Sequence, residues 1–291
     1  MGSTPRATIP FVQALLVYAV YAVGYPWFAA RVPPMRGGYL AAEAASFALV
    51  GIGVALLDCR GVPAGFFAGA RNRWARGLPT ALHVFWLLGL IALALRIADP
   101  GFDDLEFAGR GLDTLADVAT MLAILPFGVA AEELVFRTCQ KRLRRTLTAS
   151  TACVGVALAF ALFHWVPGTP LDRHEIETLL ATFAGGLAFA VAYEKTDSIP
   201  LLIALHLGYD NLAVIQGWLN VHRERALEAL LFVFWIGGGA VMALLAHRRS
   251  VTRLEWEPDR WKASATGWTA SLGFGLAVPL ILARMRLWLG I

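Results

Sequence analysis

Long runs of apolar residues, separated by short polar stretches, dominate the 291-residue chain. A helix needs about 20 predominantly apolar residues to cross the hydrocarbon region of a bilayer. Nine runs approach or reach that length and predict membrane helices at 9–31, 40–57, 79–97, 114–136, 150–166, 177–193, 199–219, 228–247 and 268–288. The pattern therefore predicts an all-α fold, a polytopic transmembrane bundle of about eight or nine helices.

Composition supports this class of protein. Hydrophobic residues make up 58% of the chain and charged residues only 16%, whereas soluble domains average about 25% charged residues. The net charge of +4 comes from short basic clusters between apolar runs, as in cytoplasmic loops, so we expect no nucleic-acid partner. Cys59, Cys139 and Cys153 form no CxxC pair and predict neither a disulfide framework nor a thiolate metal site.

The basic residues also predict the orientation of the chain. Apart from Arg137, fifteen Lys and Arg residues fall on the side that contains the N-terminus, and nine fall on the other side. The larger set includes the run from Lys141 to Arg145 and the group Arg248, Arg249, Arg253, Arg260 and Lys262, while the acidic loop 99–113 lies opposite. The positive-inside rule then predicts a cytoplasmic N-terminus. The Ala-, Leu- and Arg-rich character favours a high-GC bacterium and its inner membrane.

No internal repeat, linker or separate soluble domain interrupts the pattern, so residues 1–291 are predicted to form one integral membrane domain. Within it, residues 1–110 are N-terminal helices without a recognised motif. Residues 112–219 carry the polar motifs described next and are the predicted catalytic core. Residues 228–291 are the C-terminal helices.

Charged side chains inside a membrane helix cost roughly 2.5–3.5 kcal/mol on insertion scales, so they are candidates for function. The first group is Glu132-Glu133-x-x-x-Arg137. Glu133 and Arg137 are four residues apart on a helix, so we expect them to form a pair. Glu132 is rotated by about 100° and lies outside that pair, which makes it the candidate for chemistry. The alternative is a helix end with snorkelling charges.

The second group is the sequence FALFH, which places Phe160 and His164 on one face of the next helix. If RRTLTAS makes the turn of a helical hairpin centred near residue 148, Glu132 lies 16 residues before that centre and His164 lies 16 after it. Antiparallel helices of equal rise bring both side chains to the same depth. The spacing therefore favours a functional pair over a histidine that only packs.

The third group is HLGYD, in which His206 and Asp210 are one helical turn apart and Asn211 is adjacent. Pro200 suits the first turn of this helix and places His206 inside the span. Such a polar pair can simply hold two helices together. With the other motifs it predicts a shared polar cavity, in which Phe160 and Asn211 are expected to contact the substrate.

These three motifs, in this order, resemble the CAAX protease and bacteriocin-processing (CPBP, or Abi) family of intramembrane glutamic endopeptidases. The family pattern is EExxxR, then FxxxH, then HxxxN or HxxxD, and the resemblance covers about residues 120–215. It implies an intramembrane peptide hydrolase with its active site inside the helix bundle and without a metal or other cofactor.

The resemblance also implies roles for individual residues. Glu132 is implied to be the general base that activates water, and His164 to share that water or its proton. Glu133 and Arg137 are implied to hold the first helix and orient the site.

His206 and Asp210 are implied to stabilise the oxyanion or to position the scissile carbonyl. Asp210 stands where some family members carry asparagine. Because an ionised carboxylate cannot donate a hydrogen bond to an oxyanion, Asp210 is either protonated or acts by orienting His206.

The implied partners are the lipid bilayer and a membrane-associated protein or peptide, cut near its C-terminus. A bacterial source favours a sorting-tail or peptide substrate over a CAAX-like one. Three alternatives stay open: a zinc protease using Glu132, His164 and His206 as ligands, a proton-coupled transporter with a Glu/His relay, and a non-catalytic scaffold. The chain shows no inverted repeat or matched pair of broken helices that would favour a transporter.

Overall fold

The computed structural model of the chain describes residues 5–29, 31, 36–57, 70–98, 114–165, 169–249, 262 and 264–289. All regular secondary structure within these ranges is helical, which confirms the predicted all-α class. The predicted orientation depends in part on the acidic loop 99–113, Arg253 and Arg260. These residues lie outside the described ranges.

Each of the nine predicted spans coincides with a helical segment. The first seven are α1 (Pro5–Ala29), α2 (Arg36–Leu57), α4 (Ala70–Ala98), α5 (Leu115–Leu143), α6 (Ala149–His164), α7 (Arg173–Thr196) and α8 (Ile199–Val221). The eighth joins α9 (Arg225–Phe232), the π-helical η2 (Val233–Gly238) and α10 (Gly239–Arg249). The ninth joins α12 (Ala265–Leu272), the π-helical η3 (Gly273–Ala277) and α13 (Val278–Leu289).

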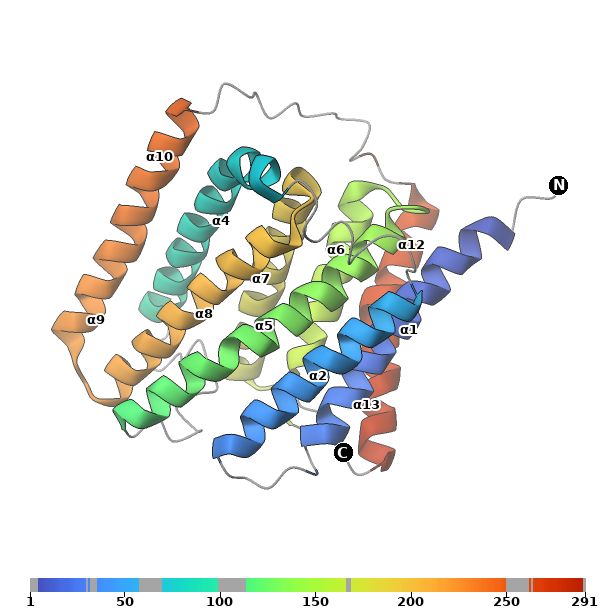
Figure 1. The fold of residues 1–291 in the computed structure, drawn as a ribbon, viewed down its shortest axis with the longest axis horizontal. Helices are drawn as coiled ribbons and strands as arrows, with labels where there is room; N and C mark the ends of the chain where they lie inside the picture. Colours follow the sequence, from blue (N-terminus) through green and yellow to red (C-terminus); the bar gives the residue numbers. More distant parts are fainter. Residues whose placement is uncertain are drawn as a thin grey trace.

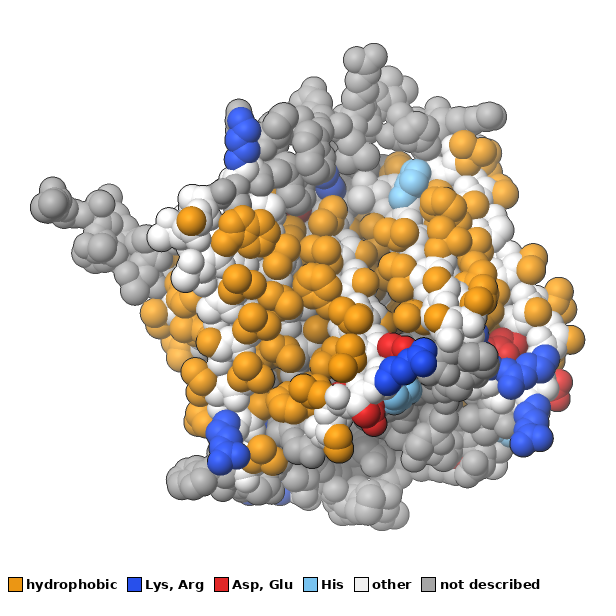
Figure 2. Space-filling model, turned by 180° about the vertical axis from the view of Figure 1, so that it is seen from behind, with side chains coloured by type: hydrophobic (Ala, Val, Ile, Leu, Met, Phe, Trp, Pro, Cys, Tyr) orange, Lys and Arg blue, Asp and Glu red, His pale blue; other side chains and the backbone are white. Residues whose placement is uncertain are grey.

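Seven of these segments, within the described ranges, are long and apolar enough to cross a membrane. The other two have shorter apolar stretches, Ala44–Val54 in α2 and Ala149–His164 in α6. Figure 2 shows hydrophobic side chains spread over the middle of one face, while charged side chains gather near its upper and lower edges. The protein is an integral, multi-pass membrane protein.

The helices that carry the polar motifs lie at the centre of the bundle. In Figure 1, α5 and α8 run side by side, with α1, α2, α12 and α13 on one flank and α4, α9 and α10 on the other. Helix α5 also packs against α1 and α2, and α6 packs against α7. The α5–α6 and α7–α8 turns lie on the same side of the bundle as the start of α4 and the end of α10 (Figure 1).

Two tight turns set the positions of the motif helices. Helix α5 ends at Leu143 and α6 begins at Ala149, so the predicted hairpin turn is confirmed. The Arg144 guanidinium binds the Leu147 carbonyl at 2.7 Å and Glu194 of α7 at 2.8 Å, which ties this turn to α7. At the next turn the Ser198 hydroxyl caps the start of α8, and Pro200 occupies the first turn as expected.

The first motif helix extends further than its apolar run predicts. The hydropathy pattern ends near residue 136, but α5 continues for another seven residues to Leu143. Its last two turns carry the buried polar residues Arg137, Thr138, Gln140 and Arg142. The helix continues because these side chains face other helices rather than lipid, an environment that a one-dimensional hydropathy profile cannot distinguish.

Candidate active site

The Glu133–Arg137 pair forms as the i,i+4 spacing predicts. Arg137 Nε lies 2.9 Å from Glu133 Oε2, and both side chains are almost completely inaccessible to solvent. A buried charge is tolerated only when it is paired and hydrogen-bonded. The pair therefore keeps two charges inside the bundle at a defined place on α5.

Glu133 makes a second contact that local spacing does not predict. Its Oε1 atom lies 2.9 Å from His206 Nδ1 on α8. Because Arg137 holds this glutamate as a carboxylate, Nδ1 of His206 is the hydrogen-bond donor. The first and third motifs are thereby joined directly, and the His206 ring is fixed from α5.

Glu132 faces two imidazoles at once. Its Oε1 atom lies 3.8 Å from His164 Nε2 on α6, and its Oε2 atom lies 3.9 Å from His206 Nε2 on α8. The hairpin spacing correctly predicts that Glu132 and His164 meet. Both distances exceed that of a direct hydrogen bond, and a water molecule between the groups can bridge such separations.

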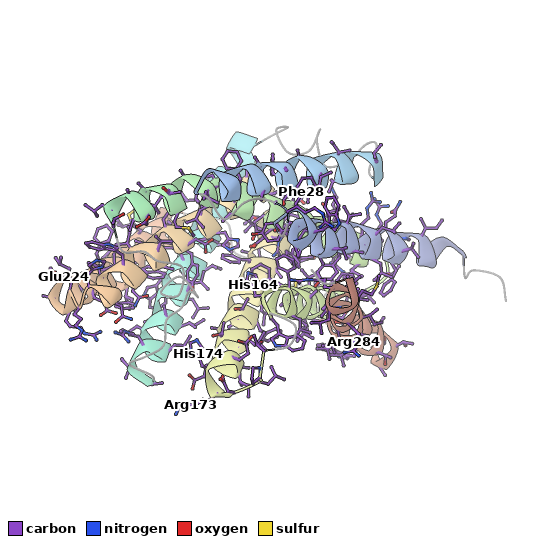
Figure 3. The ribbon with its side chains drawn as sticks, turned by 90° about the horizontal axis from the view of Figure 1, so that it is seen from below. Phe28, His164, Arg173, His174, Glu224 and Arg284 are labelled. Atoms are coloured by element: carbon purple, nitrogen blue, oxygen red, sulfur yellow. The ribbon has the colours of Figure 1, made fainter. Side chains whose placement is uncertain are left out.

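The tautomer of His164 follows from its backbone contact. Its Nδ1 atom lies 2.9 Å from the Phe160 carbonyl, one turn earlier on α6. A carbonyl oxygen only accepts, so Nδ1 carries the hydrogen, and in the neutral ring Nε2 is a hydrogen-bond acceptor. That acceptor faces Glu132. His164 is also the last residue of α6 and its side chain is 36% exposed, so it lies where solvent can reach it. Figure 3 shows it among the surrounding helices, whereas Arg173 and Glu224 lie at the edge.

His206 has a different environment. Its ring lies against Phe189 of α7, with centroids 4.5 Å apart, and the edge of Phe160 approaches it at 5.9 Å. Its Nε2 atom lies 3.6 Å from Asp210 Oδ1. Because Nδ1 already donates to Glu133, Nε2 can act as a donor only when the ring is doubly protonated. The carboxyl groups of Glu132, Glu133 and Asp210 surround the ring.

Two residues predicted to contact substrate have other surroundings. Phe160 is buried, and it packs edge-on against Phe136 at 5.0 Å and beside the His164 ring at 4.7 Å. Asn211 follows Asp210 and is rotated from it by about 100° around α8. Its Oδ1 atom is buried and has no hydrogen-bond partner among the residues that the structure describes. Contact of either side chain with substrate stays a prediction.

The sequence motifs do not include two residues that hold the site. Gln140 Oε1 accepts from Arg137 Nη1 at 2.8 Å, and Phe189 covers the His206 ring. Gln140 carried a signal, because it lies three residues after Arg137 and so shares its helix face. Phe189 lies in an ordinary apolar run of α7, and nothing in the sequence distinguishes it from its neighbours.

Metal ligation was the main alternative use of these side chains. Across the described residues, no three His, Cys, Asp or Glu side chains are grouped so that they could hold one metal ion.

A comparison with protein families found a match over the helices that carry the motifs. A family model named Rce1-like matches residues 114–212. Its description is type II CAAX prenyl endopeptidase Rce1-like. That model belongs to the CPBP family. The resemblance to CPBP proteins is confirmed. No curated protein and no solved structure matches the chain.

The CPBP-like segment, residues 114–212, runs from the N-cap of α5 into the middle of α8. It contains every polar residue brought together at the site, on three different helices. The description of the matched family is that of an endopeptidase, which acts on proteins or peptides. The family match therefore indicates a peptide hydrolase.

Proposed function

We propose that this protein is an intramembrane endopeptidase of the glutamic type, in which Glu132 activates a water molecule that attacks a peptide bond. The substrate is a membrane-associated protein or peptide cut near its C-terminus. The observation that carries the proposal is the position of Glu132, whose two carboxylate oxygens face Nε2 of His164 and Nε2 of His206.

The activation step follows from the tautomer of His164. A water molecule between Glu132 and His164 can donate one hydrogen to the carboxylate and the other to Nε2 of the neutral imidazole. Its lone pair is then directed at the scissile carbonyl carbon. As the new C–O bond forms, the water proton passes to Glu132, which acts as general base.

The remaining steps use the same groups. The substrate carbonyl becomes an oxyanion, and a doubly protonated His206 can donate to it from Nε2 while Nδ1 stays bound to Glu133. When the C–N bond breaks, the leaving amine takes the proton held by Glu132. The carboxylate is regenerated, and one water molecule has been consumed.

Asp210 is best assigned to His206 rather than to the oxyanion. Its Oδ1 atom lies 3.6 Å from His206 Nε2, close enough to stabilise the positive charge of the imidazolium. An ionised Asp210 serves this role without any donor hydrogen. The departure from asparagine is therefore compatible with the mechanism.

Two finer features belong to the same proposal. We place the protein in a bacterial inner membrane with its N-terminus in the cytoplasm, because the basic residues gather on that side. Its substrate is a sorting-tail or CAAX-like peptide. A CAAX-type peptide with and without its prenyl group is the comparison that separates these substrates.

The decisive experiment compares Glu132→Gln with wild type in liposomes that contain candidate C-terminal peptides. Loss of a general base lowers turnover by about 10²–10⁴-fold, and we expect a loss of that order for Glu132→Gln. Glu224→Gln is the matched control, because Glu224 is an exposed glutamate at the start of α9. It should cleave at the wild-type rate.

Cleavage by Glu132→Gln at the wild-type rate would show that another group is the base. Proton or solute flux that depends on Glu132, with no proteolysis of any peptide tested, would favour the transporter instead. Mass spectrometry of the products gives the cut site and its distance from the C-terminus.

A further inference from the structure

Gln140 lies fully buried at a point where three helices meet. From α5 its Oε1 atom contacts Arg137 Nη1 at 2.8 Å, and its Nε2 atom contacts the Ala190 carbonyl of α7 at 2.8 Å. The same Nε2 atom lies 3.5 Å from Cys153 Sγ of α6. A primary amide is costly to bury unless both of its ends are satisfied, and here both ends are.

The orientation of this amide is determined by its partners. The guanidinium of Arg137 only donates, so the atom that faces it must be an oxygen. The Ala190 carbonyl only accepts, so the atom that faces it must be the NH₂ group. Neither a carboxylate nor an apolar side chain of similar size can satisfy both partners.

Two chains of contact lead from Gln140 to His206. The first runs through Arg137 and Glu133, whose Oε1 atom holds His206 Nδ1 at 2.9 Å. The second runs through Ala190, whose neighbour in the chain, Phe189, lies against the His206 ring. Gln140 thus connects to both the edge and the face of this imidazole.

We propose that Gln140 is a positioning residue of the active site, which orients His206 by bracing Arg137 and by holding α7 at the correct distance from α5. Both ends of its amide contact protein atoms, Arg137 Nη1 and the Ala190 carbonyl. Its importance for catalysis rests on the proposed function, whereas its effect on the His206 ring does not.

The variants are chosen to separate positioning from folding. Gln140→Met keeps the volume and removes both hydrogen bonds, and Gln140→Glu keeps the acceptor for Arg137 but cannot donate to Ala190 as a carboxylate. Thr138→Val is the control, because Thr138 is a buried polar residue of the same helix. Within the described part of the chain, its hydroxyl has no hydrogen-bond partner.

The direct readout is the ¹⁵N spectrum of the imidazole side chains in detergent-solubilised protein, with the His206 signals assigned from their loss in His206→Gln. We expect the His206 signals of Gln140→Met and Gln140→Glu to shift or split, and those of Thr138→Val to match wild type. No substrate is needed, so a wild-type protein that cleaves nothing would defeat the proposed function and leave this test intact.

The kinetic readout compares how much each Gln140 substitution changes kcat and how much it changes KM. Misplacing a catalytic group by about 1 Å can cost up to roughly 100-fold in rate. For both Gln140 variants we expect kcat to fall by about 10- to 100-fold with KM nearly unchanged.

Unchanged His206 signals and an unchanged kcat in both Gln140 variants would overturn the proposal. It would also be overturned if both variants failed to fold while Thr138→Val folded normally, because Gln140 would then be a residue required for stability rather than for positioning.

Discussion

Glu133 Oε1 and His206 Nδ1 lie 2.9 Å apart, and this contact joins two motifs that are 73 residues apart in the chain. The other carboxylate oxygen of Glu133 holds Arg137. Both carboxylate oxygens of Glu133 therefore contact side chains, and these contacts link α5 to α8. Its neighbour Glu132 faces the two Nε2 atoms, as the proposed mechanism requires.

Glu133→Gln should therefore reduce both stability and activity. The neutral amide leaves the buried Arg137 charge without its counter-ion, and breaking a buried pair costs about 3–5 kcal/mol. Thermal unfolding in detergent measures the first effect, and peptide cleavage measures the second. Glu177→Gln is the matched control, because Glu177 also pairs with an arginine four residues away, at 2.7 Å, but that arginine is 75% exposed. It should cost less than about 1 kcal/mol. Equal losses in the two variants would contradict the structural role of Glu133.

His164→Gln should lower turnover by about 10²–10⁴-fold, because the substitution removes the acceptor that shares a water molecule with Glu132. Stability should change little, since the side chain is partly exposed. The chain offers close controls in His222 and His83, whose Nδ1 atoms also contact the carbonyl four residues earlier, at 2.9 Å and 2.6 Å. His222→Gln and His83→Gln should cleave normally. A loss of activity in these controls as large as in His164→Gln would show that the effect does not depend on proximity to Glu132.

Asp210→Asn and Asp210→Ala distinguish the two roles considered for Asp210. If Asp210 acts by stabilising a positively charged His206, both variants lose activity, because neither carries the negative charge. If the position serves as an oxyanion donor, Asp210→Asn keeps or raises kcat and only Asp210→Ala loses it. We expect the first pattern, from the 3.6 Å separation of Asp210 Oδ1 and His206 Nε2. Steady-state kcat values of the two variants decide between them.

Chelation tests the zinc alternative directly. Activity should survive prolonged treatment with a strong chelator, and elemental analysis of the active, purified protein should find no stoichiometric zinc. A catalytic zinc ion supplies the attacking hydroxide, so its removal would abolish turnover. Loss of activity on chelation, with recovery when zinc alone is added back, would replace the metal-free mechanism.

Much of the site follows from local periodicity. The pairing of Glu133 with Arg137 needs only the rise and twist of one helix, and the meeting of Glu132 with His164 needs only a short hairpin turn. Both were predictable because the partners lie on one helix or on two helices joined by a short turn, so the intervening geometry leaves little freedom. The family resemblance added the third motif but not its contacts.

The contacts of His206 required the tertiary structure. By ideal helix rise, His206 lies about 10 Å from the start of α8, whereas His164 lies at the far end of α6, so spacing alone could not show that both reach Glu132. The rotation and tilt of α8 against α5 decide this, and they depend on the packing of every helix in the bundle. The same packing brings α7 into the site through Phe189 and Ala190, although α7 carries none of the motifs.

The sequence by itself determined the membrane-spanning helices, the Glu133–Arg137 pair and the hairpin partners Glu132 and His164. Each of these depends on interactions within one helix or across one turn. Only the tertiary structure decided which imidazole nitrogens face Glu132, how Gln140 bridges α5 and α7, and that Phe160 is buried in the core. These depend on the relative rotation of helices that are distant in the chain, which side-chain periodicity does not specify.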